Sequence, residues 1–355
     1  MKVCNHCGTH HNTPCDFTEE DSEQSSGQDS GGRVKVLITG SAGFIGAHLV
    51  EHLLVNTDWD IVGLDSFKHR GDSLRVIRNP RYQVHACDLS SPISYRLADQ
   101  MGEVDFIVNM ASESHVDRSI TDPVPFVQNN VNLALYMLEY ARLVKPKVFV
   151  QISTDEVYGP AKEGTKHAEW SMILPSNPYS ASKAAQEALG HAYWKTYGVP
   201  VVVTNTMNNF GERQDPEKYI PMLISRIMKG ERVTVHGTES YIGKRHYLHA
   251  RNHADAILFL LQQPLRFDQP MLPRFNIVGE TEMDNLELAK KVARVLKKDL
   301  RYELVDFHSA RPGHDPRYAL DGSLMGSLGW KPPVDFESSL EKTIHWTLDH
   351  LEWLR

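Results

Sequence analysis

The chain has 355 residues, of which 41% are hydrophobic and 23% are charged, as in an ordinary soluble protein. No apolar run approaches the length of about 20 residues that a membrane span needs. The net charge of −7 is spread without a basic face for nucleic acid. The first residues also lack the apolar core of a signal peptide, so we expect a cytoplasmic protein with no membrane or nucleic-acid partner.

Residues 1–32 form an acidic segment that differs in composition from the rest of the chain. A CxxC pair, a third cysteine and a nearby histidine have the donor atoms of a tetrahedral zinc site. The residues concerned are Cys4, Cys7 and Cys15, with His10 or His11. An unstructured tail with incidental thiols is the alternative. The following run, DFTEEDSEQSSGQDSGG, is typical of a flexible linker, so the folded body should begin near residue 33.

Short runs rich in β-branched residues alternate with helix-length segments in the first half of the folded body. The runs cover residues 33–40, 60–65, 82–89, 105–111, 147–153 and 200–206. Continuous apolar strands suit a parallel sheet that is covered on both faces. The alternation therefore predicts an α/β protein with a Rossmann-type, doubly wound parallel sheet.

Two helices are expected in this half, over residues 123–144 and from about Tyr179. Their apolar faces can pack on the sheet, or they can pair with a second subunit in a homodimer. After about residue 207 the alternation weakens, and isolated helical patterns follow at 217–230, 283–298 and 336–354. We expect the first domain over 33–207 and 244–278. A smaller mixed α/β lobe should comprise 208–243 and 279–355.

A glycine-rich turn joins the first strand of the folded body to the next helix. The stretch VLITGSAGFIGAHLV places Gly40, Gly43 and Gly46 there, one residue different in spacing from the usual GxGxxG dinucleotide fingerprint. Such a turn brings a diphosphate close to the backbone at a helix N-terminus. Asp65 ends the next strand, where a carboxylate can bond ribose hydroxyls and repels the extra phosphate of NADP. The pattern predicts NAD.

Two pairs of residues can carry chemistry. Asp155 and Glu156 follow Thr154 directly after the strand over 147–153; a surface turn is the alternative reading. Tyr179 and Lys183 are four residues apart, on one face of the predicted helix. A lysine there favours the phenolate, moving the pKa of the tyrosine toward neutral so that it can remove a hydroxyl proton.

The glycine loop and the Tyr-x-x-x-Lys pair together resemble the extended short-chain dehydrogenase/reductase superfamily. Several stretches are similar to the nucleotide-sugar 4,6-dehydratases within it: ASESHVDRSI (111–120), STDEVYG (153–159), YSASKA (179–184), NNFGERQDPEKYIP (208–221) and RPGHDPRYALD (311–321). The similarity covers roughly residues 34–350. It implies that the first domain binds NAD and that the second lobe binds a nucleotide sugar such as dTDP-glucose or UDP-glucose.

The resemblance also implies roles for particular residues. Tyr179 and NAD oxidise the sugar at C4, Glu156 removes the C5 proton, and Asp155 protonates the departing C6 hydroxyl. Thr154 holds the sugar hydroxyl. The implied cofactor contacts are Gly40, Gly43, Phe44, Ile45, Gly46, Asp65, Ser66, Asp88, Leu89, Ala111, Ser112, Glu113, Asn129, Tyr179, Lys183 and Asn209. The implied substrate contacts are His115, Thr154, Asn208, Lys218, Tyr219, Ile220, His236, Arg245, Asn276, Arg311 and His314.

Some segments depart from the family pattern. RHYLHARNH replaces the usual RDWLYVEDH, ERQDPEK replaces a more aromatic run, and His236 stands where tyrosine is common. The nucleotide preference therefore stays open among dTDP-glucose, UDP-glucose and another nucleotide hexose. A 4-epimerase or decarboxylase of the same superfamily is the first alternative function. A non-catalytic nucleotide-sugar-binding protein is the second.

Overall fold

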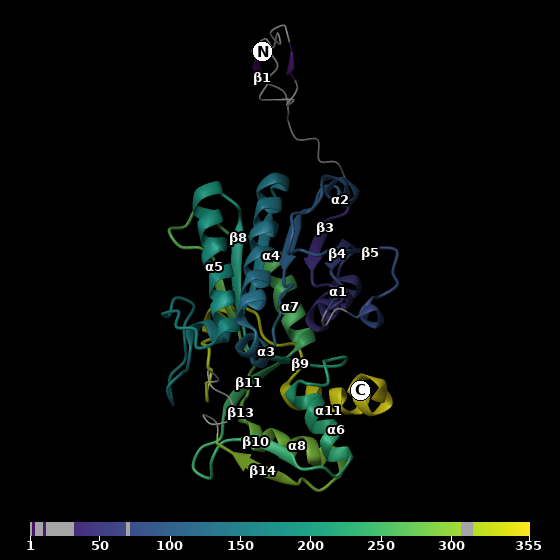
Figure 1. Ribbon diagram of the computed structural model, residues 1–355, viewed down its shortest axis with the longest axis vertical. Coiled ribbons are helices and arrows are strands. Elements are labelled where there is room, and N and C mark those ends of the chain that lie inside the picture. The colour runs from purple at the N-terminus through teal and green to yellow at the C-terminus, as the bar shows by residue number, and fades with distance from the viewer. Residues whose placement is uncertain (1, 4–9, 12–31, 69–71, 307–314) are drawn as a thin grey trace. The chain divides into compact units, whose positions relative to one another are not determined.

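The computed structural model describes residues 2–3, 10–11, 32–68, 72–306 and 315–355 (Figure 1). The chain divides into residues 1–33 and 34–355. In the first unit, β1 (Lys2–Val3) pairs antiparallel with β2 (His10–His11). The zinc prediction falls on Cys4, Cys7 and Cys15, which lie outside the described residues, so it stays a prediction. No helix in the described ranges is both long and apolar enough to span a bilayer.

The second unit is built around a seven-stranded sheet in which every neighbouring pair is parallel. The strand order is β12-β8-β7-β6-β3-β4-β5. This confirms the Rossmann-type doubly wound fold. The order reverses on either side of β3, and ligands of such sheets bind at the carboxyl ends of the strands near that point. The strands are β3 (Lys35–Thr39), β4 (Asp60–Asp65), β5 (Tyr82–Ala86), β6 (Phe106–Asn109), β7 (Val148–Thr154), β8 (Val201–Thr206) and β12 (Arg274–Ile277).

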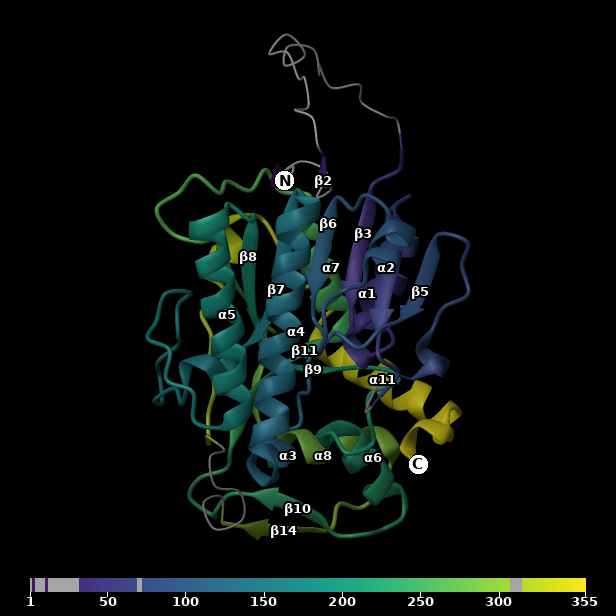
Figure 2. The same cartoon turned by 45° about the horizontal axis from the view of Figure 1, so that its top comes forward.

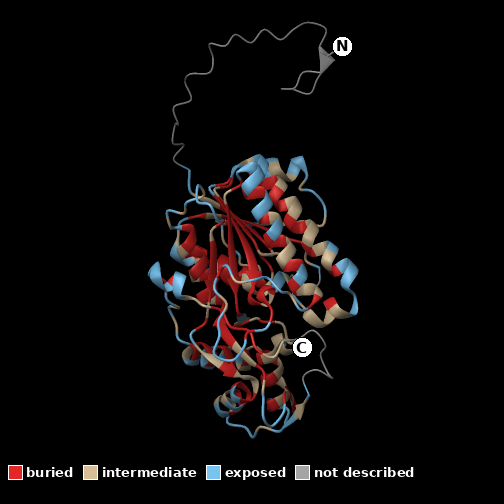
Figure 3. Cartoon of the chain, turned by 90° about the vertical axis from the view of Figure 1, so that its left-hand side faces the viewer, coloured by how far each residue is buried: buried red, intermediate tan, exposed pale blue. Residues whose placement is uncertain are grey.

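Helices cover both faces of this sheet because its strands are apolar on both sides. In β3, Val36 and Ile38 belong to a core shared with α1 (Phe44–Asn56) and α7 (Ala250–Leu261). Leu37, between them, belongs to the opposite core, with α2 (Tyr95–Met101), α4 (Pro123–Val144) and α5 (Pro178–Tyr197). Figure 2 shows α4 and α5 side by side on their face. Figure 3 shows the buried strands between helices whose outer surfaces are exposed.

The remaining elements form a smaller lobe beyond the carboxyl ends of the strands (Figure 1). Its core gathers apolar side chains from α6, α8 and α11 and from the adjoining strands. The division of residues 34–355 into two domains with the predicted boundaries stays a prediction. The elements are α6 (Tyr219–Met228), α8 (Asn285–Leu296), α11 (Phe336–Asp349), parallel β10 (Val233–His236) and β14 (Tyr302–Val305), and the sheet of β9 (Asn208–Phe210), β11 (Lys244–His249) and β13 (Glu282–Asp284). The exception is α10 (Ser323–Ser327), which packs against β12 and places Met325 in the core of the large sheet.

Candidate active site

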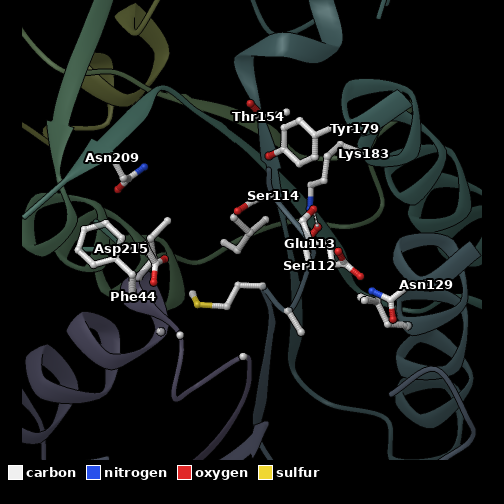
Figure 4. Close-up of a pocket in the computed structure, with 18 of the residues that line it drawn as sticks. Phe44, Ser112, Glu113, Ser114, Asn129, Thr154, Tyr179, Lys183, Asn209 and Asp215 are labelled. Carbon is white, nitrogen blue, oxygen red and sulfur yellow. Dashed lines mark hydrogen bonds between the residues drawn. The ribbon is translucent and has the colours of Figure 1, made fainter. Parts of the chain in front are cut away.

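A cavity of about 820 Å³ opens at the carboxyl ends of the central strands. Every predicted cofactor residue and all five predicted catalytic residues line it. Figure 4 shows Thr154, Tyr179 and Lys183 together on one side, with Phe44, Asn209 and Asp215 on the other. Segments that are far apart in the chain therefore meet at one site, as the predicted topology requires.

The glycine loop fits its predicted role in holding a diphosphate. Gly40 has φ 70°, and its carbonyl accepts a hydrogen bond from the Gly43 amide at 3.0 Å. A Cβ on Gly46 would stand 2.1 Å from the Gly40 carbonyl oxygen, which is far inside van der Waals contact. Only glycine lets α1 begin so close to the turn, with its N-terminal residues at the cavity wall.

Asp65 ends β4 at the cavity and is buried. Its Oδ2 accepts a hydrogen bond from the Ala42 amide at 2.9 Å, and its Oδ1 accepts one from the Phe67 amide at 2.9 Å. The carboxylate therefore shapes the glycine loop as well as facing the place where a ribose would lie. Asp88, farther along this wall, forms an exposed ion pair with Lys68 at 2.6 Å.

The two acids lie in a short 3₁₀ turn, η3 (Asp155–Tyr158), which begins where β7 ends. The Thr154 hydroxyl donates to Asp155 Oδ1 at 2.9 Å. Asp155 Oδ2 is buried and has no hydrogen-bond partner among the described residues. Asn177, the N-cap of α5, donates from Nδ2 to Glu156 Oε2 at 3.2 Å.

Electrostatics distinguish Asp155 from an ordinary surface acid. Burial, followed by the negative charge of Glu156, raises the pKa of Asp155 to about 7. Burial also raises the pKa of Glu156, although the Asn177 hydrogen bond and the charge of Arg245 oppose the rise. A carboxyl group that stays protonated near neutral pH, with a buried oxygen free to donate, can act as a general acid. Because Asp155 is buried, the alternative reading of Asp155 and Glu156 as part of a surface turn is excluded.

Tyr179 and Lys183 lie on α5 beside the acids, but their electrostatics differ from the sequence-based expectation. Burial, then the charges of Glu156 and Asp155, raises the pKa of Tyr179 well above its ordinary value. Burial lowers the pKa of Lys183 to about 7. The Lys183 ammonium donates to Gln186 Oε1 at 2.6 Å. The prediction that Lys183 lowers the pKa of Tyr179 is therefore wrong for this structure: burial and the two acids raise it, and the opposing effect comes from a hydrogen bond with Thr154.

Comparison with known proteins places this geometry in a family. Residues 37–343 match the family model of GDP-mannose 4,6 dehydratase. The dTDP-glucose 4,6-dehydratase of Escherichia coli is 35% identical over 351 residues, which covers 90% of this chain and 95% of that protein. The chain belongs to the nucleotide-sugar 4,6-dehydratase family, within the short-chain dehydrogenase/reductase superfamily.

Solved structures agree with this assignment. DesIV, a dTDP-glucose 4,6-dehydratase from Streptomyces venezuelae solved with NAD, is 33% identical, with a TM-score of 0.81 and coverage of 90% of this chain and 98% of that chain. The UDP-glucose 4-epimerase of Thermus thermophilus is similar too, at 26% identity, with a TM-score of 0.79 and coverage of 88% and 98%. The fold alone thus does not separate dehydratase from epimerase.

The structure brings only part of the predicted substrate set to the cavity of this 4,6-dehydratase family member. The members of this set that line the cavity are Thr154, Asn208, Lys218, Tyr219 and Ile220. The described residues His115, His236, Arg245 and Asn276 are not among the lining residues. Arg311 and His314 lie outside the described residues. The roles of these six as substrate contacts stay predictions.

Arg245 and Asn276 have well-defined places in the fold. The Arg245 guanidinium donates to the carbonyl oxygens of Lys244, Asp315 and Pro316 at 2.7–2.9 Å and stacks on Tyr318. Its charge opposes the rise in the pKa values of Asp155 and Glu156. The Asn276 amide donates to the carbonyls of His167 and Asp321 and accepts from Tyr158. Asn276 therefore holds loops together beneath the site.

Sequence reasoning missed several residues of the site. Asn177 and Tyr318, whose hydroxyl donates to Glu156 Oε2 at 3.5 Å, contact the proposed base directly. The Asn-Pro start of α5, typical of a helix N-cap, was a usable signal for Asn177. Gln214 and Asp215 also line the cavity. They lie in ERQDPEK, within the stretch 208–221 that carries the family resemblance, but the resemblance assigned no role to either residue.

Proposed function

We propose that this protein is an NAD-dependent dTDP-glucose 4,6-dehydratase, which converts the sugar to its 4-keto-6-deoxy form. The observation that carries the proposal is the acid pair of η3. Asp155, with its pKa raised to about 7, and Glu156 face the same cavity as Tyr179 and Lys183. A 4-epimerase or decarboxylase needs the tyrosine and lysine but no such acid–base couple. The names of the relatives support dTDP-glucose as the substrate.

NAD is the proposed cofactor. The residues at the cavity wall suit it: three glycines let α1 approach a diphosphate, and Asp65 lies at the end of β4 for a ribose. DesIV and the Thermus epimerase were both solved with NAD, which supports the same choice. NAD supplies the hydride acceptor at sugar C4, the hydride donor at C6, and a positive ring charge.

The chain's own residues handle the protons. Thr154 orients the C4 hydroxyl, and Tyr179 takes its proton as the carbonyl forms. Because Asp155 and Glu156 raise the pKa of Tyr179, a positive charge in the cavity is needed to bring out its basic form. Lys183, on the same helix face, supplies one when protonated.

The elimination step uses the acid pair. A 4-keto group acidifies the C5 proton, which Glu156 removes, and Asn177 holds that carboxylate in place. Asp155 donates a proton from Oδ2 to the C6 hydroxyl as it leaves as water. Glu156, after its proton has exchanged with solvent, protonates C5 as a hydride returns to C6, and becomes a carboxylate again. Asp155 regains a proton from solvent, and Tyr179 gives up to solvent the proton it took from the C4 hydroxyl.

Proton NMR in deuterated water, with dTDP-glucose and UDP-glucose in separate tubes, tests the proposal. A new C6 methyl group together with deuterium at C5 is expected, and the relative rates identify the preferred base. An inverted C4 centre with the C6 hydroxyl retained would make the protein an epimerase. Unchanged sugar in both tubes, after NAD is supplied, would indicate another nucleotide hexose or a binding protein.

We also propose a homodimer that pairs the outer surfaces of α4 and α5. Apolar side chains are exposed there, at Val124 and Leu143 on α4 and Tyr197 on α5. Sedimentation equilibrium would give the mass in solution, and a monomer would contradict the proposal. The predicted cytoplasmic location stays a prediction.

A further inference from the structure

The loop over residues 212–215 places an acid, Asp215, at the cavity that we propose holds the diphosphate of NAD. His48 and Glu51 of α1 contact this loop: His48 Nε2 lies 3.0 Å from the Glu212 carbonyl oxygen, and Arg213 Nη2 pairs with Glu51 at 2.6 Å. The loop therefore packs on the helix whose first residues border the diphosphate site. Asp215 lines the cavity, on the same side as Phe44 in Figure 4. An unpaired carboxylate there would repel a diphosphate.

Arg75 is the counter-ion of this acid. It lies in the 3₁₀ turn η2 (Ser73–Arg75) and is 3% exposed. Its Nη2 is 3.0 Å from Asp215 Oδ1, and its Nε and Nη2 donate to the Arg213 carbonyl at 3.1 and 2.8 Å. The Trp353 ring, in the C-terminal turn, packs 5.0 Å from the guanidinium. A planar fork is suited to holding a carbonyl and a carboxylate together.

The second acid of the loop is neutralised in a similar way. Glu212 is buried and lies 3.1 Å from His249 Nε2 and 3.2 Å from Arg251 Nη2. Between the two acids, Arg213 has φ 64°, a conformation that a non-glycine residue adopts only when its surroundings enforce it. Both departures from the family pattern, ERQDPEK and RHYLHARNH, thus meet at Glu212. The loop is fixed by cations on two sides.

We propose that Arg75 is a positioning residue of the cofactor site: it neutralises Asp215 and fixes the 212–215 loop against α1, so that the diphosphate of NAD is retained. Arg75 is not among the described residues that line the cavity, so it would act on the cofactor site through Asp215. Because Trp353 packs on the Arg75 guanidinium, the C-terminal turn supports the 212–215 loop through Arg75. The inference rests on NAD binding and not on the identity of the sugar.

Retention of NAD by the purified full-length protein tests this role. The fraction of NAD that copurifies, and its release rate after dilution, are measured for wild type, Arg75→Met, Asp215→Asn and the double variant. Arg75→Met is expected to release NAD about ten-fold faster, because a carboxylate is left unpaired beside the diphosphate. Asp215→Asn alone should release NAD more slowly than Arg75→Met, because it leaves no carboxylate at the cavity and its amide oxygen can still accept from Arg75. The double variant should recover most of the loss.

The pattern among the variants separates charge from mere packing. Equal NAD release by Arg75→Met and the double variant would overturn the proposal, because only the Arg213 carbonyl contact would then matter. Unchanged release by Arg75→Met would overturn it too, as would release by Asp215→Asn that is as fast as release by Arg75→Met. Arg75→Lys keeps the charge, so its NAD release rate should lie between those of wild type and Arg75→Met. This variant provides the test if Arg75→Met unfolds. Because no sugar is used, failure here leaves the proposed reaction untouched.

Discussion

Asp155 and Glu156 show how environment gives neighbouring acids different tasks. Asp155 accepts one hydrogen bond from Thr154 and keeps its other oxygen free of hydrogen bonds from the described residues. Glu156 accepts hydrogen bonds from Asn177 and Tyr318. Hydrogen bonds to a carboxylate favour its charged form, whereas burial beside a second acid favours the protonated form. The structure therefore suits Asp155 to be the acid and Glu156 the base.

The pH dependence of turnover should report Asp155. Its pKa is raised to about 7, and the group must be protonated to act, so kcat is expected to fall as pH rises through about 7. Initial rates from about pH 5.5 to pH 9 measure this limb. Asp155→Asn should remove most of the turnover and leave only the part of the limb that comes from Lys183, whose pKa is also about 7. Asp268→Asn, at an exposed surface acid, is the control and should keep the wild-type profile. A flat wild-type profile would remove the acid role.

Glu156→Gln should separate oxidation from elimination. The amide keeps the size of the side chain but cannot remove the C5 proton, so we expect turnover at least about 100-fold slower. Bound NAD should still be reduced by dTDP-glucose, as absorbance of NADH would show. Glu337→Gln, at an exposed acid of α11, is the matched control. Full turnover by Glu156→Gln would remove Glu156 from its role.

At the scale of the element, the short turn after a strand determines which side chains face the cavity. Successive residues of a strand point to opposite faces, so two adjacent acids would separate if β7 continued. The strand ends at Thr154 and η3 begins at Asp155, which lets both carboxyl groups face one cavity. The sequence predicted the strand from its apolar residues. The 3₁₀ turn, and with it the shared orientation, was not evident from the pattern.

Helix α5 is tied to the sheet by a buried ion pair that the sequence did not reveal. Glu187, one turn beyond Lys183, lies 2.8 Å from Arg274 of β12 and accepts a hydrogen bond from Asn205 of β8. Its charge raises the pKa of Lys183 against the effect of burial. The two partners are far apart in the sequence, so no local motif could have paired them.

Gly46→Ala tests the contact between the glycine loop and α1. A methyl group there would meet the Gly40 carbonyl, so we expect a loss of about 3 kcal/mol in the free energy of unfolding, together with loss of bound NAD. Denaturant titration and the NAD content of the purified protein measure both. Gly326→Ala is the control, because a Cβ there meets no atom within 4 Å. Equal behaviour of the two variants would contradict the packing argument.

At the scale of the whole molecule, the cavity is shared between the Rossmann sheet and the smaller lobe. The glycine loop and η3 come from the sheet, whereas Lys218, Tyr219 and Ile220 belong to the segment that begins α6. Both parts belong to the unit over residues 34–355, separate from the first 33 residues. All five candidate catalytic residues therefore lie within the unit over residues 34–355.

Deletion of residues 1–32 should leave kcat/KM within about two-fold and the melting temperature within about 4 °C of the full chain. Steady-state kinetics and thermal unfolding compare the two proteins, and metal analysis of the full chain tests the predicted zinc at Cys4, Cys7 and Cys15. A large loss of activity would show that the segment contributes to folding, assembly or the site. Zinc at one equivalent in the full chain alone would support a metal-binding tail.

The sequence by itself determined the Rossmann sheet, and it singled out the glycine loop and the five candidate catalytic residues that line one cavity. These features depend on local patterns: apolar strands, glycine spacing, and residues four apart on a helix. Tertiary structure alone decided the environment of those positions. Burial and neighbouring charge set the pKa values of Asp155 and Lys183, and Arg75 meets Asp215 only because the folded chain brings η2 and the 212–215 loop together. Such effects depend on distance in space, which no local pattern encodes.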